Sequence, residues 1–370
     1  MIRVLHVISS LGGGGVEHML YSYYLNIDRN KVHFDFVVHG SAIEILEAKV
    51  QSLGAKVFHV TPKKVSIKRN ILEIDKIIRS GNYDVVHCHQ NFSNFTTLFL
   101  AKKNHVPVRI SHSHGCKKTK SINELVKMQV LRLLNKANAN YFFSCGIEAA
   151  KWLHGQSCFQ NGKNIIMNNA IDLSVFSFDI GIREKYRKRF KIEDKVVLLH
   201  VGRFSNEKNH LFLLDIIQKL SLCNRQYVLL LVGNGAEEEA VKMYAQKKHI
   251  VDKVLFLGVR NDIAEIMNAA DIFLLPSKHE GFGITLIEAQ ATGLQVFASN
   301  NVTKETMLTD LIEYLPIENT NIWIEKILAV KNTFRESRKE DIKASGYSVD
   351  MQAIKYENWL ENVCNKDIVK

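Results

Sequence analysis

Two glutamates that stand eight residues apart, Glu280 and Glu288, carry the most chemical content in this sequence of 370 residues. The letters between them, GFGITLI, supply glycines for a tight turn, and residues 285–292 have the pattern of a helix. Two carboxylates can accept hydrogen bonds from sugar hydroxyls, and the amides at a helix N-terminus favour a phosphate. The alternative is a loop with two unrelated acids, but the whole pattern is more specific than its parts.

Two cations, Arg203 and Lys208, stand five residues apart in the segment VGRFSNEKNH, residues 201–210. The segment follows an expected strand and opens an expected helix. Arginine can grip phosphate oxygens in a bidentate manner, and lysine adds a point charge. Two solvated surface cations are the alternative. Their place at the carboxyl end of a parallel strand favours an anion site.

A glycine run, GGGGVE at residues 12–17, follows the first expected strand and precedes a helix. Glycines let the backbone approach a phosphate closely. The spacing does not match the GxGxxG dinucleotide fingerprint, because Glu17 stands where the third glycine belongs. We expect a phosphate contact here, and a simple flexible turn is the alternative.

Four histidines stand in two pairs at the ends of two expected strands: His87, His89, His112 and His114. Because strand side chains alternate, the two members of each pair point to the same face. Cys88 and Cys116 lie nearby, so zinc has to be considered, but structural zinc sites prefer compact cysteine-rich spacing. We therefore predict no metal site. One or two imidazoles should line a cleft and donate hydrogen bonds, while the others pack.

The net charge of +11 and a pI near 9.2 indicate an anionic partner. Much of this charge stands in the segment that starts at Lys117 and ends at Asn138, with Lys118, Lys120, Lys127, Arg132 and Lys136 against Glu124. Val126, Val130, Leu133 and Leu134 give the same segment an apolar face. A helix lying on anionic lipid and a soluble basic helix fit this pattern equally well. No nucleic-acid-binding motif is evident, so we expect no nucleic acid partner.

Hydrophobic residues make up 46% and charged residues 24% of the chain, which excludes a disordered or collagen-like protein. Six cysteines without CxxC spacing predict free thiols in a reducing compartment. No run of 18 apolar residues is present, and the N-terminal apolar run has the length of a strand. We therefore expect a cytoplasmic protein.

Short apolar runs alternate with amphipathic stretches in two series. We expect strands at residues 2–9, 34–38, 56–60, 85–89, 108–113 and 141–144, and then at 196–201, 227–232, 254–257, 272–275 and 295–298. Continuous short runs of this kind suit the buried strands of doubly wound parallel α/β sheets. The alternation predicts one domain at 1–172, a second at 173–348 with the connection at 172–195, and a terminal helix in 349–370.

These elements in this order resemble the large retaining glycosyltransferase family 4, which has the GT-B fold. The likeness rests on GGVE, NAID at residues 169–172, VGRFSNEKNH and EGFGITLIE, and the N-terminal HVISSLGGGGVEHML is similar to bacterial capsule and exopolysaccharide transferases. The resemblance implies two Rossmann-like domains facing a central cleft. The first would bind the acceptor and the second the nucleotide sugar, with the terminal helix returning to the first domain.

By this resemblance, Arg203 and Lys208 hold the donor diphosphate, Glu280 contacts hydroxyls of the donor sugar and Glu288 holds the ribose. His114, or as second choice His112, contacts the donor sugar. The remaining expected contacts come from backbone atoms: the amides of Gly281, Phe282, Gly283, Ile284 and Thr285, those of Gly14 and Gly15, and Val259 beside the base.

The resemblance implies a retaining, metal-independent hexosyltransferase that needs no cofactor. Its partners would be a nucleotide-sugar donor, with UDP favoured over GDP, and a lipid-linked saccharide acceptor at the inner face of the membrane. Two alternatives remain open: another GT-B enzyme, such as a nucleotide-sugar epimerase or a phosphorylase, and a non-catalytic sugar-nucleotide-binding subunit.

Overall fold

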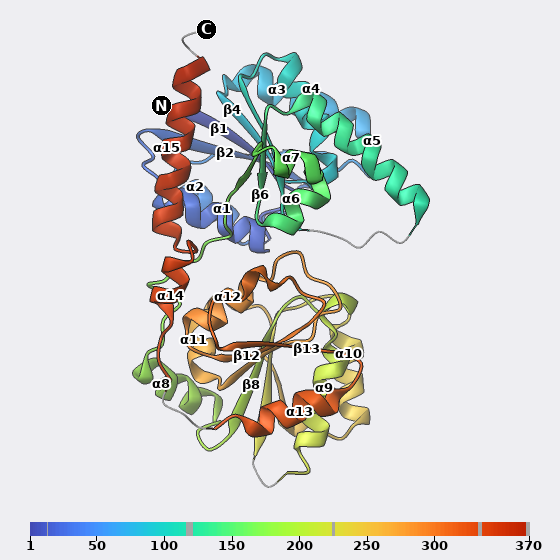
Figure 1. The fold of residues 1–370 in the computed structure, drawn as a ribbon, viewed down its shortest axis with the longest axis vertical. Helices are drawn as coiled ribbons and strands as arrows, with labels where there is room; N and C mark the ends of the chain where they lie inside the picture. The colour runs from blue at the N-terminus through green and yellow to red at the C-terminus, as the bar shows by residue number, and fades with distance from the viewer. Residues whose placement is uncertain (13, 116–120, 224–225, 332–334, 368–370) are drawn as a thin grey trace. The chain divides into compact units, whose positions relative to one another are not determined.

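A computed structural model describes residues 1–12, 14–115, 121–223, 226–331 and 335–367. The chain divides into two compact units. Unit 1 comprises Met1–Ile171 together with Gly346–Lys370, and unit 2 comprises Asp172–Ser345. Each unit is a parallel sheet with helices on both faces (Figure 1). The predicted doubly wound α/β class is therefore confirmed.

Unit 1 is built on a seven-stranded sheet in the order β3-β2-β1-β4-β5-β6-β7. The strands are β1 (Ile2–Val7), β2 (Val32–His39), β3 (Val57–Val60), β4 (Val85–Cys88), β5 (Val108–Ser113), β6 (Tyr141–Ser144) and β7 (Asn164–Ile166). The helices are α1 (Gly15–Asn26), α2 (Glu47–Ser52), α3 (Ile67–Gly81), α4 (Asn94–Lys103), α5 (Ile122–Asn138), α6 (Ile147–His154), α7 (Gln156–Gln160) and α15 (Val349–Asp367).

Unit 2 is built on a six-stranded sheet in the order β10-β9-β8-β11-β12-β13. The strands are β8 (Val196–Val201), β9 (Tyr227–Val232), β10 (Val254–Phe256), β11 (Ile272–Leu275), β12 (Gln295–Ser299) and β13 (Ile312–Leu315). The helices are α8 (Ile180–Phe190), α9 (His210–Leu220), α10 (Glu238–Lys247), α11 (Ile263–Ala269), α12 (Ile284–Ala291), α13 (Thr320–Ala329) and α14 (Lys339–Ala344). This is the strand order of a Rossmann fold.

The order of strands reverses once in each unit, between β1 and β4 and between β8 and β11. Ligands of open α/β sheets bind outside the carboxyl ends of the strands at this reversal, because the flanking helices leave it on opposite faces. The residues after β8 and β11, and those after β1 and β4, therefore lie where chemistry is expected.

Each expected strand has a counterpart in the structure, but β7 and β13 were not predicted. Both are edge strands, with residues that are mostly only half-buried. Such strands lack the continuous apolar run on which the prediction depended. The segment 172–195, predicted as a connection, contains α8, whose Tyr186 belongs to a core cluster of unit 2.

The terminal helix α15 belongs to unit 1, where it lies beside α1 (Figure 1). Its buried side chains Ala353, Tyr356, Leu360 and Cys364 join the core cluster that covers one face of the sheet. Val4 and Cys364, at opposite ends of the sequence, thereby share one core. Among the described residues, no helix is long and apolar enough to cross a bilayer.

Candidate active site

The loops that follow β8 and β11 in unit 2 are tied to each other by polar contacts. Asn209, at the start of α9, has a left-handed backbone with φ 59° and donates from Nδ2 to the carbonyl of Pro276 at 3.2 Å. The amide of Lys278 donates to the carbonyl of Glu207 at 2.8 Å. These contacts hold the loop that carries Arg203 and Lys208 against the loop that carries Glu280.

Lys208 and Glu280 form an ion pair between these loops, with Lys208 Nζ donating to Glu280 Oε1. The hydroxyl of Ser277 donates to the same oxygen at 3.1 Å. The side chains of Lys208 and Glu280 are only 18% and 12% exposed. Sequence analysis missed Ser277. The structure thus joins two residues that the sequence assigned to one ligand, and it fixes the carboxylate between two donors.

Arg203 is exposed, and among the described residues its guanidinium has no hydrogen bond or ion pair. It follows Gly202, where a Cβ atom would lie 3.1 Å from Lys208 Cε and 3.0 Å from His200 Nε2. Any larger residue would therefore press on the lysine. The loop presents one paired cation and one free cation, which is a suitable arrangement for an anion with several oxygens.

The turn before α12 has the geometry that its glycines predict. Gly283 has φ +82°, a conformation that favours glycine. The amides of Gly281, Gly283, Ile284 and Thr285 donate no hydrogen bond to the described residues. The ring of Phe282 is buried and anchors the turn. Four amides at a helix N-terminus therefore remain for an anionic or hydroxyl ligand.

Glu288 lies on α12, one turn after Ile284, and is partly buried. Its carboxyl group has no hydrogen-bond or ion-pair partner among the described residues. Burial raises the pKa of Glu288 from 4.5 to about 7. A carboxylate held in this way gains from any ligand that donates hydrogen bonds to it.

This raised pKa predicts a pH-dependent cost to stability. The folded chain holds the Glu288 proton more tightly than the unfolded chain, so the free energy of unfolding should fall as pH rises from about 4.5 to about 7 and then level off. Glu288→Gln removes this titration. Urea unfolding at pH 8 should show the variant more stable by roughly 1–3 kcal/mol, with no difference at pH 4.5.

Glu325→Gln on the exposed face of α13 controls for the loss of one negative charge. A stability difference for Glu288→Gln that is equal at both pH values would contradict the assignment.

Val259 is 52% exposed and follows β10 at the edge of the sheet. The preceding carbonyl, that of Gly258, accepts from the amide of Gly233 at 2.8 Å. The backbone N–H and C=O of Val259 form no hydrogen bond with the described residues. They are therefore available to the edge of a base, as the resemblance implies.

In unit 1, Gly14 precedes α1 and Gly15 begins it. Two carboxylates lie at this glycine loop: Glu44 accepts from the amide of Leu11, and Glu17 Oε1 accepts from Ser10 Oγ at 3.2 Å. A phosphate bound here would meet negative charge. The predicted phosphate contact of Gly14 and Gly15 stays a prediction, and these carboxylates weigh against it.

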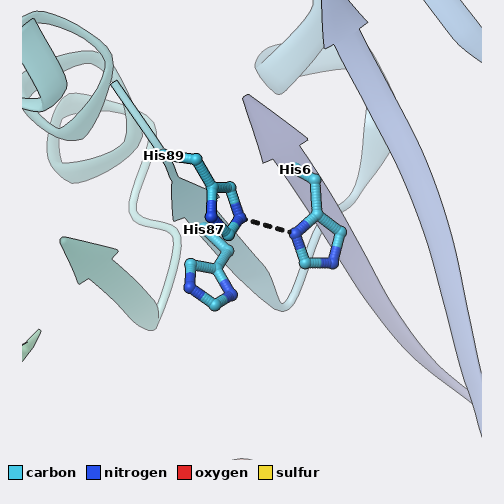
Figure 2. A group of neighbouring side chains, drawn as sticks. All are labelled: His6, His87 and His89. Atoms are coloured by element: carbon cyan, nitrogen blue, oxygen red, sulfur yellow. Dashed lines mark hydrogen bonds between the residues drawn. The ribbon is translucent and has the colours of Figure 1, made fainter. Parts of the chain in front are cut away.

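The structure gathers five histidines, rather than four, on one face of the unit 1 sheet. His6 on β1 pairs in register with His87 on β4, and His89, His112 and His114 follow toward the carboxyl ends of β4 and β5. Figure 2 shows His6 beside His87 and His89, with a hydrogen bond of 2.9 Å between His6 Nδ1 and His89 Nε2. Sequence analysis missed His6, although a lone histidine within a buried apolar strand was a usable signal.

These imidazoles are neutral, because burial lowers their pKa values. The pKa falls to about 3 for His6 and for His114, and well below the usual value for His87, His89 and His112. Two trios offer ligand nitrogens within 4.8 Å of one another: His6, His87 and His89, and His89, His112 and His114. Neutral rings could bind a metal ion, but none of their hydrogen bonds reaches a described carboxylate. Cys116 lies outside the described residues, and Cys88 belongs to the core on the opposite face.

The residues assigned to the site thus fall into two groups, each assembled within its own unit. Unit 2 holds Arg203, Lys208, Glu280, Glu288 and Val259, and unit 1 holds Gly14, Gly15, His112 and His114. Apart from Val259, which follows the edge strand β10, each group lies where the strand order of its sheet reverses or at the strands beside that point.

Two family profiles match the chain. The profile described as glycosyl transferases group 1 matches residues 182–321, and that described as glycosyltransferase family 4 matches residues 13–175. EpsF of Bacillus subtilis strain 168, named as a glycosyltransferase, is 32% identical over 360 residues, covering 93% of this chain and 92% of that protein. The chain belongs to the family 4, group 1 glycosyltransferases.

Other relatives narrow the subgroup. The capsular polysaccharide biosynthesis glycosyltransferase CapH of Staphylococcus aureus is 26% identical and covers 81% of this chain and 82% of its own. An Escherichia coli enzyme named UDP-Gal:alpha-D-GlcNAc-diphosphoundecaprenol alpha-1,3-galactosyltransferase is 26% identical over 63% of this chain and 62% of its own. The predicted glycosyltransferase of capsular and polysaccharide biosynthesis is confirmed.

Solved structures share the fold over nearly the whole chain. A glycosyltransferase from Rickettsia africae aligns with a TM-score of 0.77 at 18% identity, covering 98% of each chain. HepE of Anabaena, solved with UDP and glucose, aligns with a TM-score of 0.71 at 16% identity, covering 100% of this chain and 98% of its own. The predicted GT-B fold is confirmed.

Proposed function

We propose that this glycosyltransferase moves a hexose from a UDP-sugar to a hydroxyl of a lipid-linked saccharide, with retention of the anomeric configuration. The observation that carries this proposal is at the strand reversal of unit 2. Two loops are tied together there, Lys208 is paired with Glu280, and Arg203 has no partner within the described part of the chain. The Escherichia coli relative, whose name specifies UDP-galactose and a diphosphoundecaprenol-linked sugar, supports both the donor and the acceptor class. HepE, solved with UDP and glucose, supports UDP.

Cleavage of a sugar–diphosphate bond builds negative charge on the leaving oxygen. Arg203 and Lys208 would bind the diphosphate, and the free amides before α12 would add hydrogen bonds and the positive end of the helix dipole. These groups can stabilise the leaving UDP by themselves, so we propose that the step needs no metal ion. Activity should then be unchanged in excess EDTA.

The remaining roles follow from charge and hydrogen-bonding capacity. Glu280, already held by Ser277, would accept hydrogen bonds from sugar hydroxyls, and Glu288 would accept from the two ribose hydroxyls. Val259 would pair with the base through its free backbone atoms. His114 would contact the donor sugar, with His112 as the second candidate.

For the transfer itself we propose attack by the acceptor hydroxyl on the same face from which UDP leaves. The bond from the anomeric carbon to the phosphate oxygen breaks with its electron pair, the new bond to the acceptor oxygen forms, and the hydroxyl proton passes to the departing diphosphate. No separate carboxylate nucleophile is needed in this scheme.

The test starts with thermal-shift measurements on UDP- and GDP-sugars, followed by mass spectrometry of reactions with lipid-diphosphate saccharides. A sugar added to the lipid acceptor, with the donor's anomeric configuration by NMR, is the expected result. An inverted product would overturn retention. UDP binding without transfer to any acceptor would favour a non-catalytic subunit, and a changed nucleotide sugar without an acceptor would indicate an epimerase.

We also propose that α5 lies on anionic lipid. The helix buries polar residues, Asn135 and Asn138, and exposes apolar ones: Ile122, Leu125, Val126, Val130 and Leu133. A helix that packs on a protein core shows the opposite distribution, with its apolar face buried and its polar face exposed. Figure 1 shows α5 at the rim of unit 1 with one end extending beyond it. Lys127 and Lys136 are exposed on the helix, whereas Lys117, Lys118 and Lys120 lie outside the described residues.

Substitution of Leu133 by Ser should weaken binding to phosphatidylglycerol vesicles roughly tenfold, because one large apolar side chain no longer enters the lipid. Vesicle sedimentation measures this. The control is Ile67→Ser, which removes an equally exposed apolar side chain from α3 of the same unit. An equal loss of vesicle binding in both variants would refute the role of α5. So would vesicle binding that does not depend on the anionic lipid content.

A further inference from the structure

The five clustered histidines described above and Tyr356 form two separate hydrogen-bonded chains in unit 1. In the first, His6 Nδ1 is 2.9 Å from His89 Nε2, and His89 Nδ1 is 2.7 Å from His114 Nε2. In the second, the hydroxyl of Tyr356 on α15 is 2.8 Å from His87 Nδ1, and His87 Nε2 is 3.0 Å from His112 Nδ1. The ring nitrogens meet in pairs, at distances that suit N–H···N hydrogen bonds.

A neutral imidazole has one N–H and one lone pair, so each ring transmits the direction of its chain. If one end of a chain is fixed, every tautomer along it is fixed. Three outer nitrogens have no partner among the described residues: His6 Nε2, His112 Nε2 and His114 Nδ1. They are three of the four ends of the two chains, and the hydroxyl of Tyr356 is the fourth.

The direction of the second chain follows from Tyr356. Burial raises the pKa of its hydroxyl well above the usual value, so the phenol keeps its proton, and its one hydrogen-bond partner among the described residues is His87 Nδ1. Tyr356 therefore donates to His87, which donates from Nε2 to His112. His112 is left with an N–H at Nε2.

The direction of the first chain follows from its buried inner end, His6 Nε2, where an N–H without an acceptor would cost free energy. His6 is fully buried, and a buried N–H without an acceptor is rarer in proteins than a buried acceptor without a donor. His6 Nε2 therefore carries the lone pair. His6 then donates from Nδ1 to His89, and His89 donates from Nδ1 to His114. The lone pair of His114 is occupied, and its Nδ1 carries an N–H.

We propose that His6 and His89 are positioning residues that make His114 a hydrogen-bond donor to an oxygen of the sugar substrate, so that His114 cannot serve as a base. This inference rests on the proposed function, because it assigns how His114 acts in it. His114 is half-buried at the carboxyl end of β5, where a ligand oxygen can reach it more readily than it can reach His6. A substrate oxygen would supply the acceptor that the N–H at His114 Nδ1 lacks among the described residues.

The test uses the full chain labelled with 15N-histidine and long-range 1H–15N NMR, which distinguishes a protonated from a bare ring nitrogen. We expect the N–H at Nδ1 in His6, His89 and His114 and at Nε2 in His87 and His112. A free neutral histidine side chain prefers Nε2–H, so three Nδ1–H rings would be a clear signature of the network.

Two substitutions of His6 separate this role from packing. His6→Met replaces the donor to His89 by a thioether that can only accept, so His89 and His114 should shift to Nε2–H and kcat/KM should fall roughly 5–10-fold. His6→Asn keeps an N–H near the position of Nδ1 and should restore both readouts. His154→Leu is the control, because His154 is a buried histidine of the same unit that bonds instead to Asn164 and Ser111.

An Nε2–H at His114 in the native protein, or a His114 tautomer unaffected by His6→Met in a protein that still unfolds cooperatively in urea, would overturn the proposal. So would one bound dication per chain that is lost in His89→Leu. The tautomers are read without substrate, so their failure is distinct from failure of the proposed function. Expected tautomers in a chain that transfers no sugar would instead refute that function.

Discussion

Lys208→Ala should lower kcat roughly 10²–10³-fold, the usual effect of removing one group that stabilises charge in a transition state. Lys208 is largely buried and bound to Glu280, so its ammonium is held in place before the donor arrives. Charge on the leaving diphosphate grows most in the transition state, so the loss should appear in kcat. Steady-state kinetics with a fixed acceptor measure it.

UDP binding should weaken in the same variant, because the product carries the diphosphate that Lys208 binds. Lys219→Ala is the matched control. Lys219 is a lysine at the other end of α9 that bonds to Thr320 and Asn321, and its loss should change kcat by no more than about twofold. If Lys208→Ala kept the native kcat, a role for Lys208 in the reaction would be contradicted.

Glu280→Gln should lower kcat/KM roughly 10–10²-fold, because sugar hydroxyls lose a charged acceptor. Glutamine keeps the size of the side chain and can still accept from Ser277. UDP contains no donor sugar, and the substitution frees Lys208 from its ion pair. UDP should therefore bind as tightly as before or more tightly, in contrast to Lys208→Ala.

The opposite effects of the two substitutions on UDP binding make the assignment easy to refute. Isothermal calorimetry with UDP measures both variants and the double variant. Because the two side chains are in contact, their effects should not add. Weaker UDP binding in Glu280→Gln would place the carboxylate on the nucleotide rather than on the sugar.

The sequence alone determined the fold class, because buried parallel strands produce continuous apolar runs that recur with helical stretches between them. It also indicated four residues of unit 2 that follow β8 and β11, where the strand order reverses. Arg203 and Lys208 stand on one short loop. Glu280 precedes one turn and Glu288 lies on the helix that follows it, so their spacing is set by local backbone geometry. The edge strands β7 and β13 were not predicted from the sequence, because they are short and mostly half-buried.

Only the tertiary structure decided which of these groups touch. The strand reversal between β8 and β11 brings Glu280 to Lys208, and the burial that raises the pKa of Glu288 depends on packing around α12. The histidine chains depend on sheet register and on α15: His6 meets His89, and Tyr356 meets His87, across sequence separations of 83 and 269 residues. Periodicity reports which face a side chain occupies, whereas contacts between distant segments arise only when the sheet and the terminal helix are assembled.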